Sequence, residues 1–132
     1  MKQQFQYPLR TLIITDRLFD PANKLADYFM ATGNIYVMGM ASGKEEAAEI
    51  AKKEDFDYLI IAGYLKNETN YRVIEDLRKR HKRFLTVQWA IVDSLINIFC
   101  SRYKIQLKFE RTLPMEQFVD FLRAHRNDPL LQ

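Results

Sequence analysis

Leu12-Ile13-Ile14-Thr15-Asp16 is a short apolar run that ends in an acidic residue, and it is the first of five apolar runs spaced along the chain. The other four are Ile35-Tyr36-Val37-Met38, Tyr58-Leu59-Ile60-Ile61, Phe84-Leu85-Thr86-Val87 and Ile105-Gln106-Leu107-Lys108-Phe109. Segments with a helical spacing of apolar residues separate these runs. Strands that alternate with helices predict a parallel sheet with helices on both faces. We therefore expect a three-layer α/β/α domain whose ligands and chemistry would gather at the carboxyl ends of the strands.

The composition is that of one globular domain. The chain has 132 residues, of which 48% are hydrophobic and 28% charged, and we treat residues 1–132 as a single domain. No run approaches the roughly 20 apolar residues of a membrane span, and residues 1–8 lack a signal-peptide core, so we expect a cytoplasmic protein. The tail that ends at Gln132 would suit a piece of a longer regulator with an output domain, and a short native tail is the other interpretation.

The charge and the single cysteine exclude some classes of function. The net charge of +3 is too small to predict nucleic-acid binding unless it is concentrated. The basic run at 78–83 is best explained as a solvated helix end, with a phosphate or acidic-partner patch as the alternative. Cys100 is the only cysteine and lies in an apolar stretch, so it predicts a buried thiol and no disulfide within the chain.

Local signals place the helices. Asp20-Pro21 predicts a helix start with Asp20 as the cap, and Gly33 predicts its end. Ser42-Gly43-Lys44-Glu45 reads as a capping box in which Glu45 reaches back to Ser42. Further helices are expected near 69–81 and from Pro114 onward.

The last third of the chain departs from a plain pattern. A helix expected over 90–100 carries Asp93 as its single charge and is apolar around most of its circumference, which predicts either deep burial or a partner. The run at 103–110 alternates strictly between apolar and polar residues, which is typical of an edge strand. We expect an interaction face here, and its predicted members are Ile91, Leu95, Ile98, Phe99 and Tyr103.

Catalytic and metal-binding motifs find little support. The stretch 39–45 lacks the glycine spacing and the hydroxyl residue of a phosphate-binding loop. His81 and His125 lack companions at ligand spacing, so no metal site is predicted. The serines have no nearby histidine to form a hydrolytic triad, and no cofactor is predicted.

From Arg10 to about Arg126 the chain resembles the receiver domain of two-component response regulators. The resemblance rests on the order and spacing of the elements, on 12–16 as a first strand that ends in an acid, on 57–61 as a third strand, and on Arg111-Thr112-Leu113 before the last helix. It implies a flavodoxin-like fold with strand order 2-1-3-4-5. In that family two acids after the first strand bind magnesium, and an Asp at the end of the third strand accepts phosphate.

The matched positions depart from the family's pattern. Asp16 matches the first acid, but Arg17 stands at the second. The phosphoacceptor position falls on Ala62, or on Gly63 if the register shifts by one residue. Neither residue can act as a nucleophile, and a magnesium ion would meet one acid beside a cation. We expect Arg17 to pair with Asp16 or Asp20 and take the place of the metal.

The remaining strand ends complete this degenerate receiver pocket. Gln88 or Trp89 stands where the family has a Ser or Thr, and Arg111 stands where it has a Lys followed by Pro. The connection 64–70 also lacks the family's Met-Pro and Asp-Gly signature. Single residues here have simpler explanations, since Asp16 can form a turn and Trp89 can anchor a core.

Two functions remain open at this point. The first is a non-enzymatic receiver-like module without a phosphoacceptor Asp, which forms homodimers or binds a signalling protein in signal transduction or transcriptional control. The second is a flavodoxin-like domain that binds a small anionic ligand or nucleotide through Arg17, Arg111 and backbone donors at helix starts. Phosphorylation of Asp16 or Asp20 is a third and weaker alternative.

Overall fold

A single five-stranded sheet organises the molecule. The computed structural model describes residues 8–81 and 83–126. The strands are all parallel and follow the order β2-β1-β3-β4-β5. They are β1 (Leu9–Thr15), β2 (Ile35–Ala41), β3 (Tyr58–Ala62), β4 (Leu85–Ala90) and β5 (Leu107–Glu110). The predicted flavodoxin-like architecture and strand order are confirmed.

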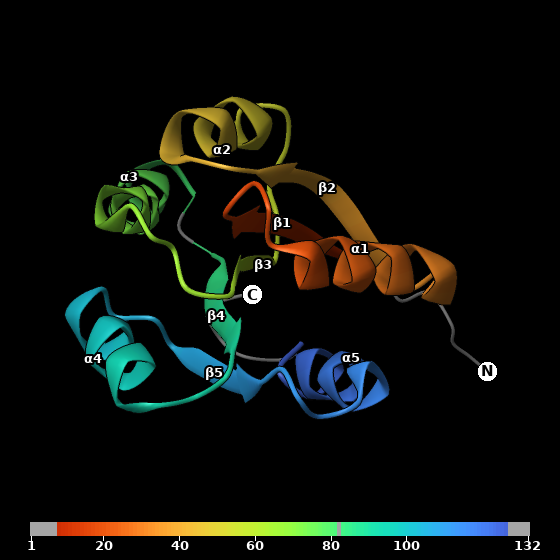
Figure 1. The fold of residues 1–132 in the computed structure, drawn as a ribbon. Coiled ribbons are helices and arrows are strands. Elements are labelled where there is room, and N and C mark those ends of the chain that lie inside the picture. The colour runs from red at the N-terminus through yellow and green to blue at the C-terminus, as the bar shows by residue number, and fades with distance from the viewer. Residues whose placement is uncertain (1–7, 82, 127–132) are drawn as a thin grey trace.

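Helices cover both faces of this sheet (Figure 1). One face carries α1 (Asp20–Thr32) and α5 (Met115–Ala124), and the other carries α2 (Lys44–Ala51), α3 (Val73–Arg80) and α4 (Ser94–Arg102). Each face therefore has its own hydrophobic core. The central strand β3 serves both, since all five of its residues are buried. No helix among the described residues is long and apolar enough to span a membrane.

The helix boundaries confirm some of the predicted signals and correct others. Gly33 ends α1 with a φ of 74°, a left-handed conformation that glycine adopts without strain. The prediction of Asp20 as the cap was wrong, because Phe19 holds the cap position and Asp20 is the first helical residue. The predicted capping box was also misassigned. Glu46 rather than Glu45 reaches back, and its Oε1 accepts a 2.7 Å bond from the backbone N–H of Ser42.

Two elements begin later than the sequence pattern indicated. A 3₁₀-helix, η1 (Glu68–Arg72), leads into α3, and its first residues are held by the side chain of Asn67. The helix predicted from residue 90 is α4, which begins at Ser94. Asp93 caps it by accepting a 2.9 Å bond from the N–H of Ile96, and Ala90 still belongs to β4. The N–H of Val92 donates to Oε1 of Glu110, the last residue of β5. This hydrogen bond holds the backbone between β4 and α4 in a non-helical position.

The fifth strand is an edge strand, as its alternation predicted. It is shorter than expected, because Ile105 precedes it and packs in the core under α2, α3 and α4. Leu107 and Phe109 pack in the opposite core. The chain changes sides between Ile105 and Leu107. Lys104, just before this point, has a φ of 56° and is the one non-glycine residue with positive φ among the described residues. The alternating apolar residues over 103–109 therefore do not share one face.

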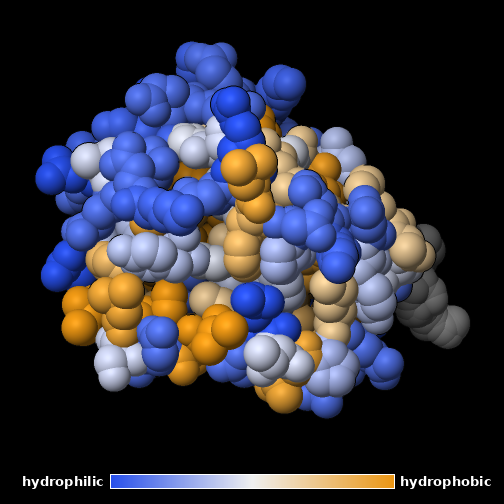
Figure 2. Space-filling view, viewed as in Figure 1, coloured by the Kyte–Doolittle hydropathy of each residue, from blue (hydrophilic) through white to orange (hydrophobic). Residues whose placement is uncertain are grey.

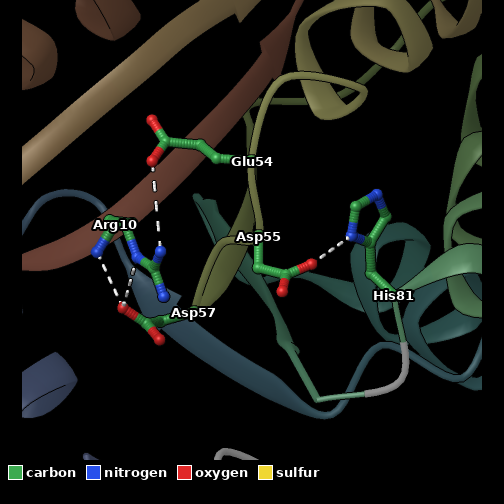
Figure 3. A network of polar contacts seen from close by, with 5 residues as sticks. All are labelled: Arg10, Glu54, Asp55, Asp57 and His81. Atoms are coloured by element: carbon green, nitrogen blue, oxygen red, sulfur yellow. Dashed lines mark hydrogen bonds and ion pairs between the residues drawn. The ribbon is translucent and has the colours of Figure 1, made fainter.

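A network of polar contacts lies at the end of the sheet where the strands begin (Figure 3). Asp57 Oδ2 accepts a 2.8 Å bond from the backbone N–H of Arg10, whose guanidinium also lies 4.0 Å from Glu54. Beside it, His81 Nδ1 lies 2.9 Å from Asp55 Oδ1. Asp55, the carboxylate partner of His81, lies far from it along the sequence. The bond between Arg10 and Asp57 joins the start of β1 to the start of β3. The candidate site lies at the other end of the sheet, where the strands end.

The residues 127–132, on which the expectation of a continuing chain rests, lie outside the described residues.

Cys100 is buried as predicted. Burial raises the pKa of its thiol, with a smaller opposing effect from Lys108. A thiol in that state is a poor nucleophile.

Candidate functional site

The carboxyl ends of four strands meet at one edge of the sheet. Thr15 at the end of β1 pairs with Ala62 at the end of β3, and Ala62 pairs with Trp89 of β4. Arg111 follows β5, and its N–H donates to the carbonyl of Ala90 at 3.0 Å. We call the space above these ends, between Asp16, Phe19, Gly63 and Arg111, the strand-end crevice.

The ring of Phe19 packs against Gly63 and Arg111 in this crevice. Gly63 has a φ of 80°, and a Cβ atom placed on it would lie 2.8 Å from Cε2 of Phe19. The guanidinium carbon of Arg111 lies 5.3 Å from the centroid of the same ring, which is within the range of a cation–π interaction. The ring is thus packed between the backbone of Gly63 and the charge of Arg111.

Asp16 is engaged by the backbone instead of by an arginine. Its Oδ2 accepts a 3.0 Å hydrogen bond from the N–H of Lys66, which holds the loop after β3. Asp20 forms its ion pair with Lys24, at 3.6 Å, and Arg17 is exposed. The expected pairing of Arg17 with Asp16 or Asp20 is therefore corrected. The cation that contributes to the crevice is Arg111.

The two β4 residues assigned to the pocket point into the cores. Gln88 is fully buried, and its Nε2 donates to the carbonyls of Ile61 at 3.1 Å and Gly63 at 2.6 Å. Trp89 is buried on the other face, where its ring stacks on Phe118 at a centroid distance of 6.1 Å. Trp89 is therefore a core anchor, and the prediction that it lines the pocket was wrong. Gln88 supports the backbone of Gly63 from below.

The residues present do not fit a magnesium site of the kind that the receiver resemblance implies. Asp16 is the carboxylate that the described residues place at the crevice, and one of its oxygens already accepts a backbone bond. The part of the chain that the structure describes contains no group of three or more potential metal ligands. Magnesium prefers several oxygen ligands in octahedral geometry, which Phe19, Gly63 and Arg111 do not supply.

An apolar groove of about 290 Å³ opens beside the crevice, toward α4. Its lining is Phe19, Gly63, Tyr64, Ala90, Ile91, Asp93, Leu95, Ile96 and Arg111. Three aliphatic side chains lie at or near it with about half of their surface in solvent. They are Ile91 (49% exposed), Leu95 (44%) and Ile98 (50%), and we call them the aliphatic patch. Figure 2 shows a hydrophobic area over α4, at the lower left of the view.

Two residues predicted for the interaction face do not belong to this patch. Phe99 is only 3% exposed and lies in the core, where it stacks on Tyr71 at 5.0 Å. Tyr103 is half-buried, and its ring also stacks on Tyr71, with 4.9 Å between the ring centroids. The hydrophobic residues that α4 leaves to solvent are thus aliphatic.

Sequence reasoning missed Phe19 and Tyr64. Phe19 stands directly before Asp20-Pro21, and an aromatic residue that precedes a helix start was the available signal for it. Tyr64 follows Gly63, and its ring packs 5.4 Å from that of Phe99. Neither contact could be read from spacing along the chain.

Solved structures of response regulators are similar to this chain. A DNA-binding response regulator of the LuxR family from Staphylococcus aureus matches with a TM-score of 0.71 and 12% identity, over 90% of this chain and 100% of that one. Chemotaxis protein CheY4 of Vibrio cholerae matches with a TM-score of 0.70 and 13% identity, over 88% and 98%. A Burkholderia pseudomallei response regulator, described with a phosphorylated aspartic acid and a calcium ion, matches with a TM-score of 0.68 and 17% identity, over 88% and 68%.

These likenesses establish the class of fold. The chain has the fold of response-regulator receiver domains, as its sequence pattern predicted. No family model and no curated protein matches the sequence.

Proposed function

We propose that this chain is an atypical receiver-fold module that has lost phosphoryl transfer and acts by binding another protein in signal transduction or transcriptional control. The likeness to response regulators of chemotaxis and of transcription supports the signalling context. The module is a binding protein and not an enzyme.

The contents of the strand-end crevice support the loss of phosphoryl transfer. Transfer to an aspartate needs a carboxylate nucleophile and a divalent cation that neutralises the developing charge. The end of β3 supplies Ala62 and is followed by Gly63, against which the ring of Phe19 packs. Arg111 stands where the family has a Lys, and its guanidinium lies over the ring of Phe19.

The observation that carries the binding role is the aliphatic patch. Three branched aliphatic side chains on one helix and its leading loop are each about half exposed, beside the apolar groove. Burial of apolar surface is the main favourable contribution to protein association, and an exposed cluster of this kind is typical of an interaction site. In the family that the chain resembles, the face formed by the fourth helix, fifth strand and fifth helix mediates dimerisation or contact with an output domain. The patch lies on the corresponding helix, and we expect a second copy or a signalling protein to cover it.

Sedimentation velocity over a range of concentrations tests this proposal. Leu95→Asp and Ile98→Asp place a charge in the patch without touching the core, because both side chains are exposed. The matched control is Met30→Asp, on α1 across the sheet, where the side chain is 59% exposed. We expect the wild type and the control to self-associate and the two patch variants to remain monomeric. A wild type that is monomeric at high concentration, or patch variants that associate like the control, would argue against self-association.

The alternative of an anionic ligand at the strand ends has less support. Arg17 does not line the apolar groove, and Arg111 already lies over the ring of Phe19. No contact of the described residues favours a ligand at this edge, so this function is not proposed.

A further inference from the structure

A second and larger groove lies between α3 with its leading 3₁₀-helix and α4, away from the strand-end crevice. It encloses about 800 Å³, the size of a small-ligand site. The two helices lie on the same face of the sheet, one above the other at the left of Figure 1. The charged residues that line the groove are Arg72, Arg78, Arg102, Lys104, Glu68 and Glu75.

Arg78 is a partly buried cation whose hydrogen bonds all go to neutral groups. Its Nη2 donates to the carbonyl of Lys104 at 2.7 Å and to Oγ1 of Thr86 at 3.4 Å, and its Nη1 donates to the carbonyl of Tyr103 at 3.5 Å. No carboxylate among the described residues forms an ion pair with it. Burial lowers the pKa of Arg78 from its ordinary value, as expected for a charge that is desolvated without a counter-ion.

The carboxylates of the groove do not balance its cations. Glu68 is already taken, since it accepts a 2.7 Å bond from Arg102 and a second bond from the hydroxyl of Tyr103. Glu75 is then the one remaining carboxylate of the groove lining, and it faces three cations, Arg72, Arg78 and Lys104. Among the described residues neither Arg72 nor Lys104 takes part in an ion pair. The groove therefore carries an excess of positive charge.

The groove also has a rigid aromatic wall. Tyr71 and Tyr103 both line it, and their rings are stacked at 4.9 Å with an interplanar angle of 7°. Lys104 also lines the groove, with a φ of 56°, a left-handed conformation that is strained for a non-glycine residue. This strained turn presents the carbonyl of Lys104 to Arg78 at 2.7 Å.

We propose that the groove between α3 and α4 binds a phosphate-bearing small molecule, with the partly buried Arg78 as the anchor and Arg72 and Lys104 as further phosphate contacts. Guanidinium groups pair with phosphate oxygens through strong charge-assisted hydrogen bonds. Tyr71 is fully buried behind Tyr103, so the half-buried ring of Tyr103 is the aromatic group that the groove presents to the rest of the ligand. This inference does not depend on the proposed protein-binding function, because the aliphatic patch contributes no residue to the groove.

Titration calorimetry with inorganic pyrophosphate, and separately with ADP, tests the proposal at low ionic strength. Replacing Arg78 would disturb the fold, because its bonds hold α3 against the connection from α4 to β5. Arg72→Gln and Lys104→Gly are therefore the informative variants, and glycine at 104 keeps the carbonyl and suits the positive φ. The matched control is Lys79→Gln, which removes one charge from α3 at a position that lines a different groove.

We expect saturable binding of pyrophosphate that each groove variant weakens by about fivefold or more, as the loss of a charged contact of roughly 1 kcal/mol implies. The control should bind like the wild type. Tighter binding of ADP than of pyrophosphate would identify a nucleotide, and equal binding would identify a simpler phosphate, and both results support the site. Absence of saturation with both probes, or equal weakening by the control and the groove variants, would overturn it.

Discussion

Gly63→Ala tests the packing of the strand-end crevice. At a φ of 80° an alanine is strained by about 1–2 kcal/mol. Its Cβ would also lie 2.8 Å from Cε2 and 2.9 Å from Cζ of Phe19, so the ring must move, and overpacking of this kind costs about 1–3 kcal/mol. We therefore expect a loss of about 2–5 kcal/mol in the free energy of unfolding, as the sum of the two effects.

A double-mutant cycle separates the two contributions. Phe19→Ala removes the ring, so in that background Gly63→Ala should cost only the backbone strain, about 1–2 kcal/mol. Urea unfolding followed by circular dichroism measures all four proteins, with the slope of each transition checked for two-state behaviour. If Gly63→Ala costs the same with and without the ring, then Phe19 does not lie against Gly63. The account of a filled crevice would then fail.

Three further predictions concern the elements around the two grooves. Asp93→Ala should lower the free energy of unfolding by about 1 kcal/mol in urea titrations, because it removes the cap that holds the N–H of Ile96; no change would mean that Asp93 does not cap α4. Lys104→Gly should raise the melting temperature, since relief of the positive φ is worth about 0.5–1 kcal/mol; a lower melting temperature would contradict the strain assigned to this turn. Hydrogen bonds from the N–H of Val92 and from Thr112 lower the pKa of Glu110, so its contribution to stability is present above the ordinary pKa of 4.5 and is lost as the pH falls below it. Urea midpoints at neutral pH and at roughly pH 3 should therefore differ less for Glu110→Gln than for the wild type, and an unchanged difference would refute this coupling.

The arrangement of the strands could be predicted because each strand is a short apolar run. β1 and β3 are buried on both faces, and such strands have no polar side that would interrupt the run. The start of α4 could not be placed in the same way. Ile91 and Val92 continue the apolar pattern, yet Glu110 binds the N–H of Val92 from a strand that follows much later in the chain. Periodicity carries no information about such a contact.

The candidate site was predictable in position and only partly in content. Ala62, Gly63 and Arg111 could be placed at the strand ends from the sequence, because the strand ends of a parallel sheet meet at one edge. The packing of Phe19 in the crevice could not be predicted from the sequence, since it depends on the left-handed conformation of Gly63. The exclusion of Phe99 from the interaction face was equally hidden, because a helix that is apolar nearly all round has no polar side to mark its orientation.

The central proposal is that this chain does not accept a phosphoryl group at the strand-end crevice, where β3 ends in Ala62 and Gly63 and an oxygen of Asp16 accepts a bond from the N–H of Lys66. Intact-protein mass spectrometry after incubation with acetyl phosphate and magnesium tests it most directly, with a phosphorylatable receiver domain treated in parallel. We predict that the mass of this chain stays unchanged while the parallel protein gains a phosphoryl group. A phosphorylated form of this chain that Asp16→Asn abolishes would contradict the claim.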